Sequence, residues 1–215
     1  MNGRKFRKIA YHIFTKIYHY LVISALFGLS ILAGLGFFTL IPALVTSFDI
    51  IKRLRKEKYK QKVKIFSLYK KNIIINLKKY WISSLVSTLL VFFVSFDILY
   101  FNLGISAIFI YLYYVFIILD FFILTAISLG SYLLACGYKL DIMDLVKNIV
   151  SIIIVNFIDI LFLNVASVAL ALILENISAI LIIILVPGIY IDFASFTYQK
   201  MLEKKSITYY LFNLK

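Results

Sequence analysis

The 215-residue sequence has few residues that support catalysis or metal binding. Its single cysteine, Cys136, excludes a disulfide framework within the chain and a zinc site built from cysteines. Its two histidines, His12 and His19, are seven residues apart, whereas two helical ligands of one metal are four apart. Phosphate-binding loops, paired His-Glu motifs and Gly-flanked serine nucleophiles are also absent. We therefore expect no catalytic centre, no metal site and no cofactor.

Charged residues are scarce as well, and acids more so than bases. They make up 15% of the chain, against about 25% in soluble domains, and 10 Asp and Glu face 23 Lys and Arg. Apolar residues, counting Tyr, make up 63%. A soluble domain of this size has too little interior to bury so much apolar surface, which excludes a soluble enzyme or a soluble nucleic-acid binder. We expect one integral membrane domain over residues 1–215, an all-α bundle of transmembrane helices.

Five apolar runs are long enough for membrane helices, which need about 20 residues. In the first run, from Tyr20 to Phe48, the segment 34–42 holds two glycines and a proline, which disfavour one continuous helix, and Thr39 suits a helix start. We therefore divide this run into a short hairpin, although a single long helix is the alternative. The six predicted spans cover residues 18–35, 39–53, 81–101, 105–137, 149–174 and 177–196. The fourth must tilt, break near Gly130 or project into the interface, and Pro187-Gly188 interrupts the sixth with a kink or a break.

The basic residues give this arrangement its orientation. All 23 Lys and Arg fall in the four segments on one side of the six spans, and the three opposite turns hold none. Because basic residues near span ends stay cytoplasmic, both termini are predicted to be cytoplasmic. A five-span protein would place the first five cations outside. Lys-, Ile- and Asn-rich usage is typical of AT-rich bacterial genomes, so we expect a multi-pass protein of the bacterial plasma membrane, without a removable signal peptide.

Two inner segments are candidates for contact with lipid or a partner. Residues 5–20 have the pattern of an amphipathic helix that lies in the headgroup region and bends into the first span. Residues 52–79 form a predicted basic cytoplasmic loop, suited to anionic lipid or to a docking partner. The aromatic residues there are better explained as interface anchors than as platforms for nucleic acid, which we do not expect as a partner. The candidate contact residues are Lys52, Arg53, Arg55, Lys56, Lys58, Lys60, Lys62, Lys64, Lys70, Lys71, Lys78 and Lys79.

Four polar residues lie inside the predicted spans, where an ionisable group costs about 2.5–3.5 kcal/mol on insertion scales. They are Asp120, Asn156, Asp159 and Asp192. These spans carry no Lys or Arg at mid-depth, so the acids must be protonated, hydrogen-bonded to polar neighbours, or face a wet cavity. Two interpretations stay open: a cation- or proton-coupled path or polar substrate pocket, and hydrogen bonds that hold the helices together.

The ordered pattern resembles the YesL-like family of bacterial integral membrane proteins. The resemblance rests on the segments 39–43, 52–57 and 65–72, on Asp97 near a span end, and on Pro187-Gly188 in the last span. Ile41 stands where the family usually has Gly, which marks a divergent member. The family is often encoded beside ATP-driven carbohydrate importers, so the resemblance implies an auxiliary role in sugar uptake. It carries no established catalytic residues over to this chain.

Three functions are compatible with these features. The first is a non-enzymatic accessory protein that docks on a membrane complex through its basic inner surface. The second is a small-molecule or ion transporter or channel that uses the intramembrane Asp and Asn. The third, an enzyme acting on lipid or glycan, requires polar groups that converge near one membrane face.

Overall fold

The computed structural model describes residues 3–57, 64–102, 107–138 and 141–203, and seven helices account for most of them. The all-α prediction is confirmed. Three helical stretches among the described residues are long and apolar enough to cross a membrane: Ile9–Ala33, Tyr113–Ala135 and Phe157–Glu175. The helices are α1 (Gly3–Ala33), α2 (Leu40–Lys56), α3 (Ile65–Asn102), α4 (Ala107–Ala135), α5 (Ile142–Val155), α6 (Phe157–Glu175) and α7 (Ala179–Glu203).

Helix α2 forms the centre of the molecule. Residues 41–48 are buried without interruption, and α2 packs against α1, α3, α4 and α7. The first half of α2 is mostly apolar, and such a segment needs cover on all sides. Its 17 residues give a length of about 25 Å, at the lower end of the range for a membrane helix. Helix α2 is the buried element around which the longer helices assemble.

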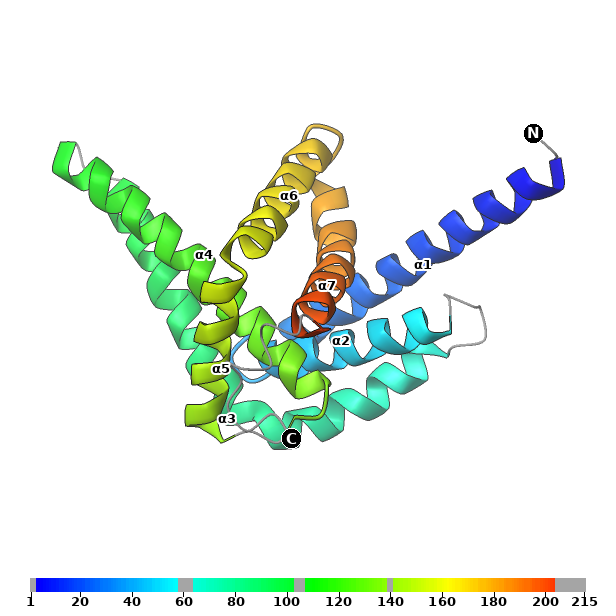
Figure 1. Cartoon of the computed structure of the whole chain (residues 1–215), viewed down its shortest axis with the longest axis horizontal. Helices are drawn as coiled ribbons and strands as arrows, with labels where there is room; N and C mark the ends of the chain where they lie inside the picture. Colours follow the sequence, from blue (N-terminus) through cyan, green and yellow to red (C-terminus); the bar gives the residue numbers. More distant parts are fainter. Residues whose placement is uncertain (1–2, 58–63, 103–106, 139–140, 204–215) are drawn as a thin grey trace.

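Apolar arms diverge from this centre. Figure 1 shows the α3–α4 hairpin, the α6–α7 hairpin and the amino-terminal part of α1 pointing away from one another. The outward faces of the two hairpins are apolar: Leu89 and Phe93 on α3, Val115 on α4 and Ile158 on α6 are all exposed. Such a surface suits hydrocarbon rather than water, in agreement with the membrane class predicted from composition.

The predicted turn in the first apolar run is confirmed. Helix α1 ends at Ala33 and α2 begins at Leu40. Between them, Leu35 and Gly36 have φ of 52° and 75°, a left-handed conformation that ends a helix. A Cβ on Gly34 would collide with the Thr39 side chain, so glycine suits the turn there. Pro42 falls in the first turn of α2, as expected.

Three sequence-based boundaries are wrong. The predicted interfacial helix 5–20 and the first span are one continuous helix, α1. Within the predicted loop 52–79, residues 52–56 belong to α2 and 65–79 to α3, because the apolar side chains at helical spacing pack on α2. The predicted span 149–174 is divided into α5 and α6 at Asn156. Gly130 and Pro187-Gly188, by contrast, break neither α4 nor α7.

The continuity of α7 has a local explanation. Pro187 removes one backbone donor, and the N–H of Gly188 donates to the Ser24 hydroxyl of α1 at 2.7 Å. Serine side chains commonly satisfy backbone groups near a proline in membrane helices. A Cβ on Gly188 would lie 2.5 Å from the carbonyl oxygen of Tyr20, so the absence of a side chain allows α7 to approach α1.

Candidate functional site

A polar cluster around Asp192 joins three helices. One carboxylate oxygen of Asp192 (α7) accepts a hydrogen bond from Arg55 Nε (α2) at 2.7 Å, and the other accepts one from the Tyr20 hydroxyl (α1) at 2.6 Å. Arg55 Nη2 contacts the same carboxylate at 2.6 Å and also donates to the Asp192 backbone carbonyl. Lys16 Nζ lies 3.7 Å from the second carboxylate oxygen. The cluster thus fastens α1, α2 and α7 together.

The Asp192 cluster is well shielded from solvent. The side chains of Asp192 and Arg55 are 11% and 20% exposed, so their ion pair is stronger than a surface pair. The guanidinium of Arg55 also lies 5.3 Å from the ring centroid of Phe196, and the Lys200 ammonium lies 4.3 Å from the same ring. Cations over aromatic faces gain electrostatic stabilisation. Arg55 is therefore held on two sides.

The expectation that Asp192 has no cationic partner is wrong. Arg55 and Lys16 lie outside the spans predicted from sequence, but α2 continues to Lys56 and α1 runs unbroken past Lys16. Their side chains therefore reach the carboxylate. The signal was present in the sequence, because Asp192 lies only four residues from the inner end of its predicted span, on the side that holds every cation.

The other three intramembrane candidates have different surroundings. Asn156 is buried at the junction of α5 and α6, and its Nδ2 donates to the Ile152 carbonyl at 3.0 Å, which caps the end of α5. Asp159 is half-buried in the first turn of α6, where a carboxylate is favoured by the helix dipole. Asp120 lies in α4 with 5% exposure. The geometry of Asn156 and Asp159 fits helix termination rather than a site at mid-depth in one long span.

Two of the candidate basic residues have structural roles. Lys52 Nζ donates to the Ala135 carbonyl at 3.3 Å and contacts Cys136 Sγ at 3.2 Å, so its charge sits at the carboxyl end of α4. That end carries partial negative charge and unpaired carbonyls, which a cation stabilises. Arg55 belongs to the Asp192 cluster. Both side chains are half-buried and turned inward.

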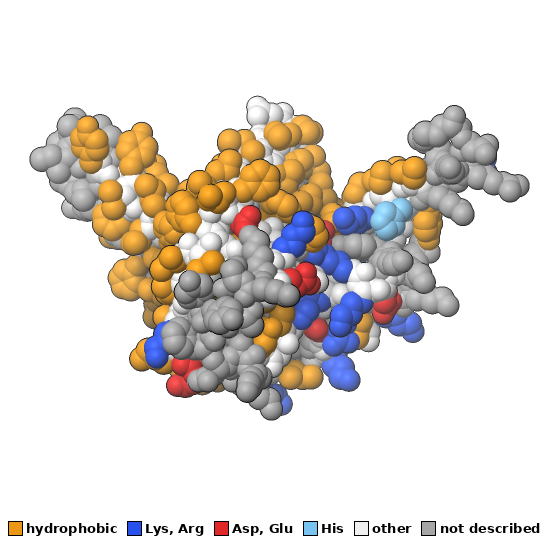
Figure 2. Space-filling view, in the orientation of Figure 1, with side chains coloured by type: hydrophobic (Ala, Val, Ile, Leu, Met, Phe, Trp, Pro, Cys, Tyr) orange, Lys and Arg blue, Asp and Glu red, His pale blue; other side chains and the backbone are white. Residues whose placement is uncertain are grey.

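Seven of the remaining candidates are exposed and form what we call the basic surface. They lie on the last turns of α2, directly before α3 and on the first half of α3, while positions 58, 60 and 62 fall outside the described residues. Figure 2 shows Lys and Arg side chains gathered on the lower part of the molecule and hydrophobic side chains covering the arms. The basic surface consists of Arg53, Lys56, Lys64, Lys70, Lys71, Lys78 and Lys79.

Hydrogen bonds between α2 and α3 fix the direction of the basic surface. Asn72 donates to the Asp49 carboxylate at 2.8 Å, Asn76 donates to the Thr46 hydroxyl at 2.9 Å, and the Ile41 N–H donates to the Ser84 hydroxyl. These pairs run in opposite directions along the two helices and set an antiparallel register. The lysines on the opposite side of α3 consequently face outward.

The exposed side of α3 changes character along its length. In its first half, exposed apolar residues such as Phe66, Ile74 and Ile75 alternate with lysines. From Ile82 onward, the exposed side chains whose burial is described are mostly apolar. Trp81 lies at the transition, the position that tryptophan favours at a membrane–water interface.

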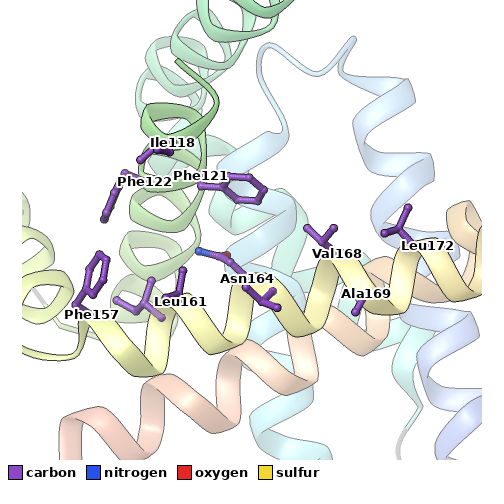
Figure 3. A pocket seen from close by; sticks show the side chains of 11 residues that line it. Ile118, Phe121, Phe122, Phe157, Leu161, Asn164, Val168, Ala169 and Leu172 are labelled. Carbon is purple, nitrogen blue, oxygen red and sulfur yellow. The ribbon is translucent and has the colours of Figure 1, made fainter. Parts of the chain in front are cut away.

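A groove lies between α4 and α6. It has a volume of about 530 Å³ and is lined by eleven residues, of which only Asn164 is polar. Figure 3 shows Phe121 on α4 facing Asn164 on α6, and Phe122 on α4 facing Phe157 on α6. The Asn164 amide donates to the Thr125 hydroxyl of α4 at 2.9 Å, which bridges the two helices. No sequence motif marks this groove, because it is formed by apolar residues that every span contains.

Two further observations complete the site. Among the described residues, no group of three or more His, Cys, Asp and Glu side chains is arranged to hold a metal ion. Comparison of the chain with protein-family models, curated proteins and solved structures gives no match. A functional assignment must therefore rest on the residues and geometry of this chain.

Proposed function

We propose that the protein is a non-enzymatic, six-span protein of the bacterial plasma membrane with both termini cytoplasmic, accessory to a transport complex such as an ATP-driven carbohydrate importer. It docks on that complex through the basic surface. The observation that carries the proposal is the density of outward-facing cations on α2 and α3. The resemblance of the sequence to the YesL-like family supplies the class of partner.

The composition of the basic surface supports docking in addition to orientation. A topology signal requires cations near span ends, but it does not require them to be interleaved with exposed apolar side chains. On α3, Lys70, Lys71 and Lys78 flank the exposed Ile74 and Ile75. This mixture suits the anionic headgroup region, where each cation contributes about 1 kcal/mol, and leaves apolar side chains for contact with a membrane-embedded subunit.

The surroundings of Asp192 weigh against the alternative, a transporter or channel that uses the intramembrane Asp and Asn. A carboxylate that accepts hydrogen bonds from Arg55 and Tyr20 is already compensated and is not available to a passing cation. The alternative still has a direct test in liposomes. If it were correct, the wild-type protein would take up an ion or sugar, and Asp159→Asn would abolish uptake without loss of folded protein.

Docking can be tested by purification in mild detergent after chemical cross-linking in the membrane. We expect the wild-type protein to recover importer subunits in fixed stoichiometry, and Lys70→Gln/Lys71→Gln to lose them at least fivefold. The control Arg7→Gln/Lys147→Gln removes the same charge from other exposed positions and should retain them. Equal recovery by both double variants, or recovery of free protein alone from the wild type, would refute docking through this surface.

A further inference from the structure

The groove between α4 and α6 lies in the part of the molecule that is suited to hydrocarbon. Both helices contain stretches that can cross a membrane, Tyr113–Ala135 and Phe157–Glu175. Along α6 the lining extends from Phe157 to Leu172, a distance of about 22 Å at 1.5 Å per residue. The molecules adjacent to such a groove in a bilayer are lipids. The groove runs along α6, and a helix that crosses the bilayer is roughly parallel to the acyl chains of the lipids.

The lining selects for an apolar occupant. Ten of the eleven lining residues are apolar, and the eleventh, Asn164, is hydrogen-bonded to Thr125. A charged or strongly polar ligand would lose its hydration here without gaining matching partners, at a cost of several kcal/mol. The rings of Phe122 and Phe157 stack with centroids 6.0 Å apart and an interplanar angle of 24°, which joins α4 and α6 at one end of the groove.

The groove is too small to enclose a helix. It offers about 530 Å³, whereas a helix about 10 Å wide and 22 Å long would occupy about 1,700 Å³. An occupant that lies within the groove is therefore a slender chain. A second cavity of about 400 Å³ shares Phe121, Asn164 and Val168 with the groove, so the space continues toward α7.

We propose that this groove binds one acyl chain of a membrane phospholipid. The chain lies along α6 between Phe157 and Leu172, and it fills the space that separates α6 from α4. Helix α4 packs mainly on α2 and α3, and α6 mainly on α7, so an occupant here supplies contacts that protein side chains leave open. The proposal rests on different residues from the basic surface and does not depend on the proposed docking function.

Photolabelling in phosphatidylcholine vesicles tests the proposal. The probe is a phosphatidylcholine that carries a diazirine near the middle of one acyl chain, and the labelled residues are identified by mass spectrometry. We expect groove residues such as Leu161 and Val168 to be labelled at least fivefold more than Ile158 and Phe162, which are exposed on the same helix outside the groove lining. A parallel arm uses a diazirine fatty acid, which should not displace the phospholipid.

Variants of α6 provide matched controls. Ala169→Trp places a large ring in the groove and should lower the labelling of Leu161 at least fivefold. Ile158→Trp adds the same ring at a position that is 79% exposed and outside the groove, and should leave the labelling unchanged. If Ala169→Trp does not fold, the distribution of label on the wild-type protein decides the question.

Three results would overturn the proposal. Equal labelling of the groove and of Ile158 would mean that only the surrounding bulk lipid contacts α6. Cross-links between two copies through α4 and α6 that exclude the phospholipid would mean that a second copy fills the groove. Labelling by the free fatty acid alone would assign the site to that ligand. None of these results affects the cross-linking test of the basic surface, so the two proposals fail independently.

Discussion

Replacing Asp192 and Arg55 separately and together measures how much the polar cluster contributes to the assembly of α1, α2 and α7. Asp192→Leu leaves a guanidinium that is only 20% exposed without its counter-charge and removes the acceptor of the Tyr20 hydroxyl. Breaking a fully buried pair from one side costs about 3–5 kcal/mol. Because this pair is partly exposed, we expect a loss of about 3 kcal/mol in the free energy of unfolding.

The double variant distinguishes pairing from simple packing. Arg55→Met alone should cost about 2–3 kcal/mol, because Asp192 keeps Tyr20 and Lys16 as partners. Arg55→Met/Asp192→Leu removes both charges, so no guanidinium is left without its counter-charge, but the Tyr20 hydroxyl still loses its acceptor. We expect the double variant to cost about 3 kcal/mol, no more than Asp192→Leu alone, which gives a coupling energy of about 2–3 kcal/mol in a double-mutant cycle.

The assay is thermal unfolding in detergent, in which the reaction of Cys136 with a fluorogenic maleimide reports the unfolded fraction. For a chain of this size, 3 kcal/mol lowers the midpoint by about 6–12 °C. Arg53→Met is the matched control on the same helix, since its pair with Asp49 is 50% exposed on the arginine side and is worth less than about 1 kcal/mol. Additive losses, or an Asp192→Leu midpoint equal to that of the wild type, would refute the ion-pair reasoning.

Three further predictions follow from single features. Gly188→Ala should lower stability by about 1–3 kcal/mol because its Cβ would collide with the Tyr20 carbonyl, whereas Gly28→Ala, with nothing within 4 Å, should be neutral or stabilising; thermal midpoints decide. Burial raises the pKa of Tyr69 above its usual value, so its stabilising contribution is complete below pH about 10 and declines as the pH rises further; Tyr69→Phe should flatten that decline in a pH series of midpoints. The predicted orientation can be tested on whole cells with a membrane-impermeant maleimide in a Cys136→Ala background. Phe38→Cys and Glu175→Cys should be labelled, because both positions are predicted to lie outside. Lys71→Cys should stay unlabelled, because it is predicted to be cytoplasmic.

The fold class and the first hairpin could be predicted because their causes are local. Composition alone excluded a soluble domain, and the glycines and proline between Gly34 and Pro42 marked a turn that the structure confirms. The sequence shows an amphipathic pattern over residues 65–79, but the density of Lys and Arg favours a loop over the whole of residues 52–79. Because Asn72 and Asn76 anchor that segment to α2, the charged stretch is helical.

The errors arose where the hydrogen bond of a polar side chain decides the outcome. The Asn156 side chain ends α5 by donating a hydrogen bond to a carbonyl four residues earlier. The mean hydropathy of residues 149–174 does not predict this helix end. Of the two expectations for Pro187-Gly188, a kink or a break, the break is wrong, because α7 is continuous and Ser24 from the opposite end of the chain accepts the Gly188 N–H. In each case an apolar run determined that a helix exists, and a polar side chain determined where it ends.

The positive charge of the chain has separable roles, and the structure assigns residues to each. A count of cations by side predicts orientation but treats Lys52, Arg55 and Lys70 alike. Lys52 stabilises the carboxyl end of α4 and Arg55 compensates Asp192, so removing either leaves a partner without compensation and weakens the fold. Lys70 and Lys71 face outward and can be neutralised at little cost. A loss of function after substitution at Lys52 or Arg55 therefore reports on folding, and only substitutions on the basic surface report on docking.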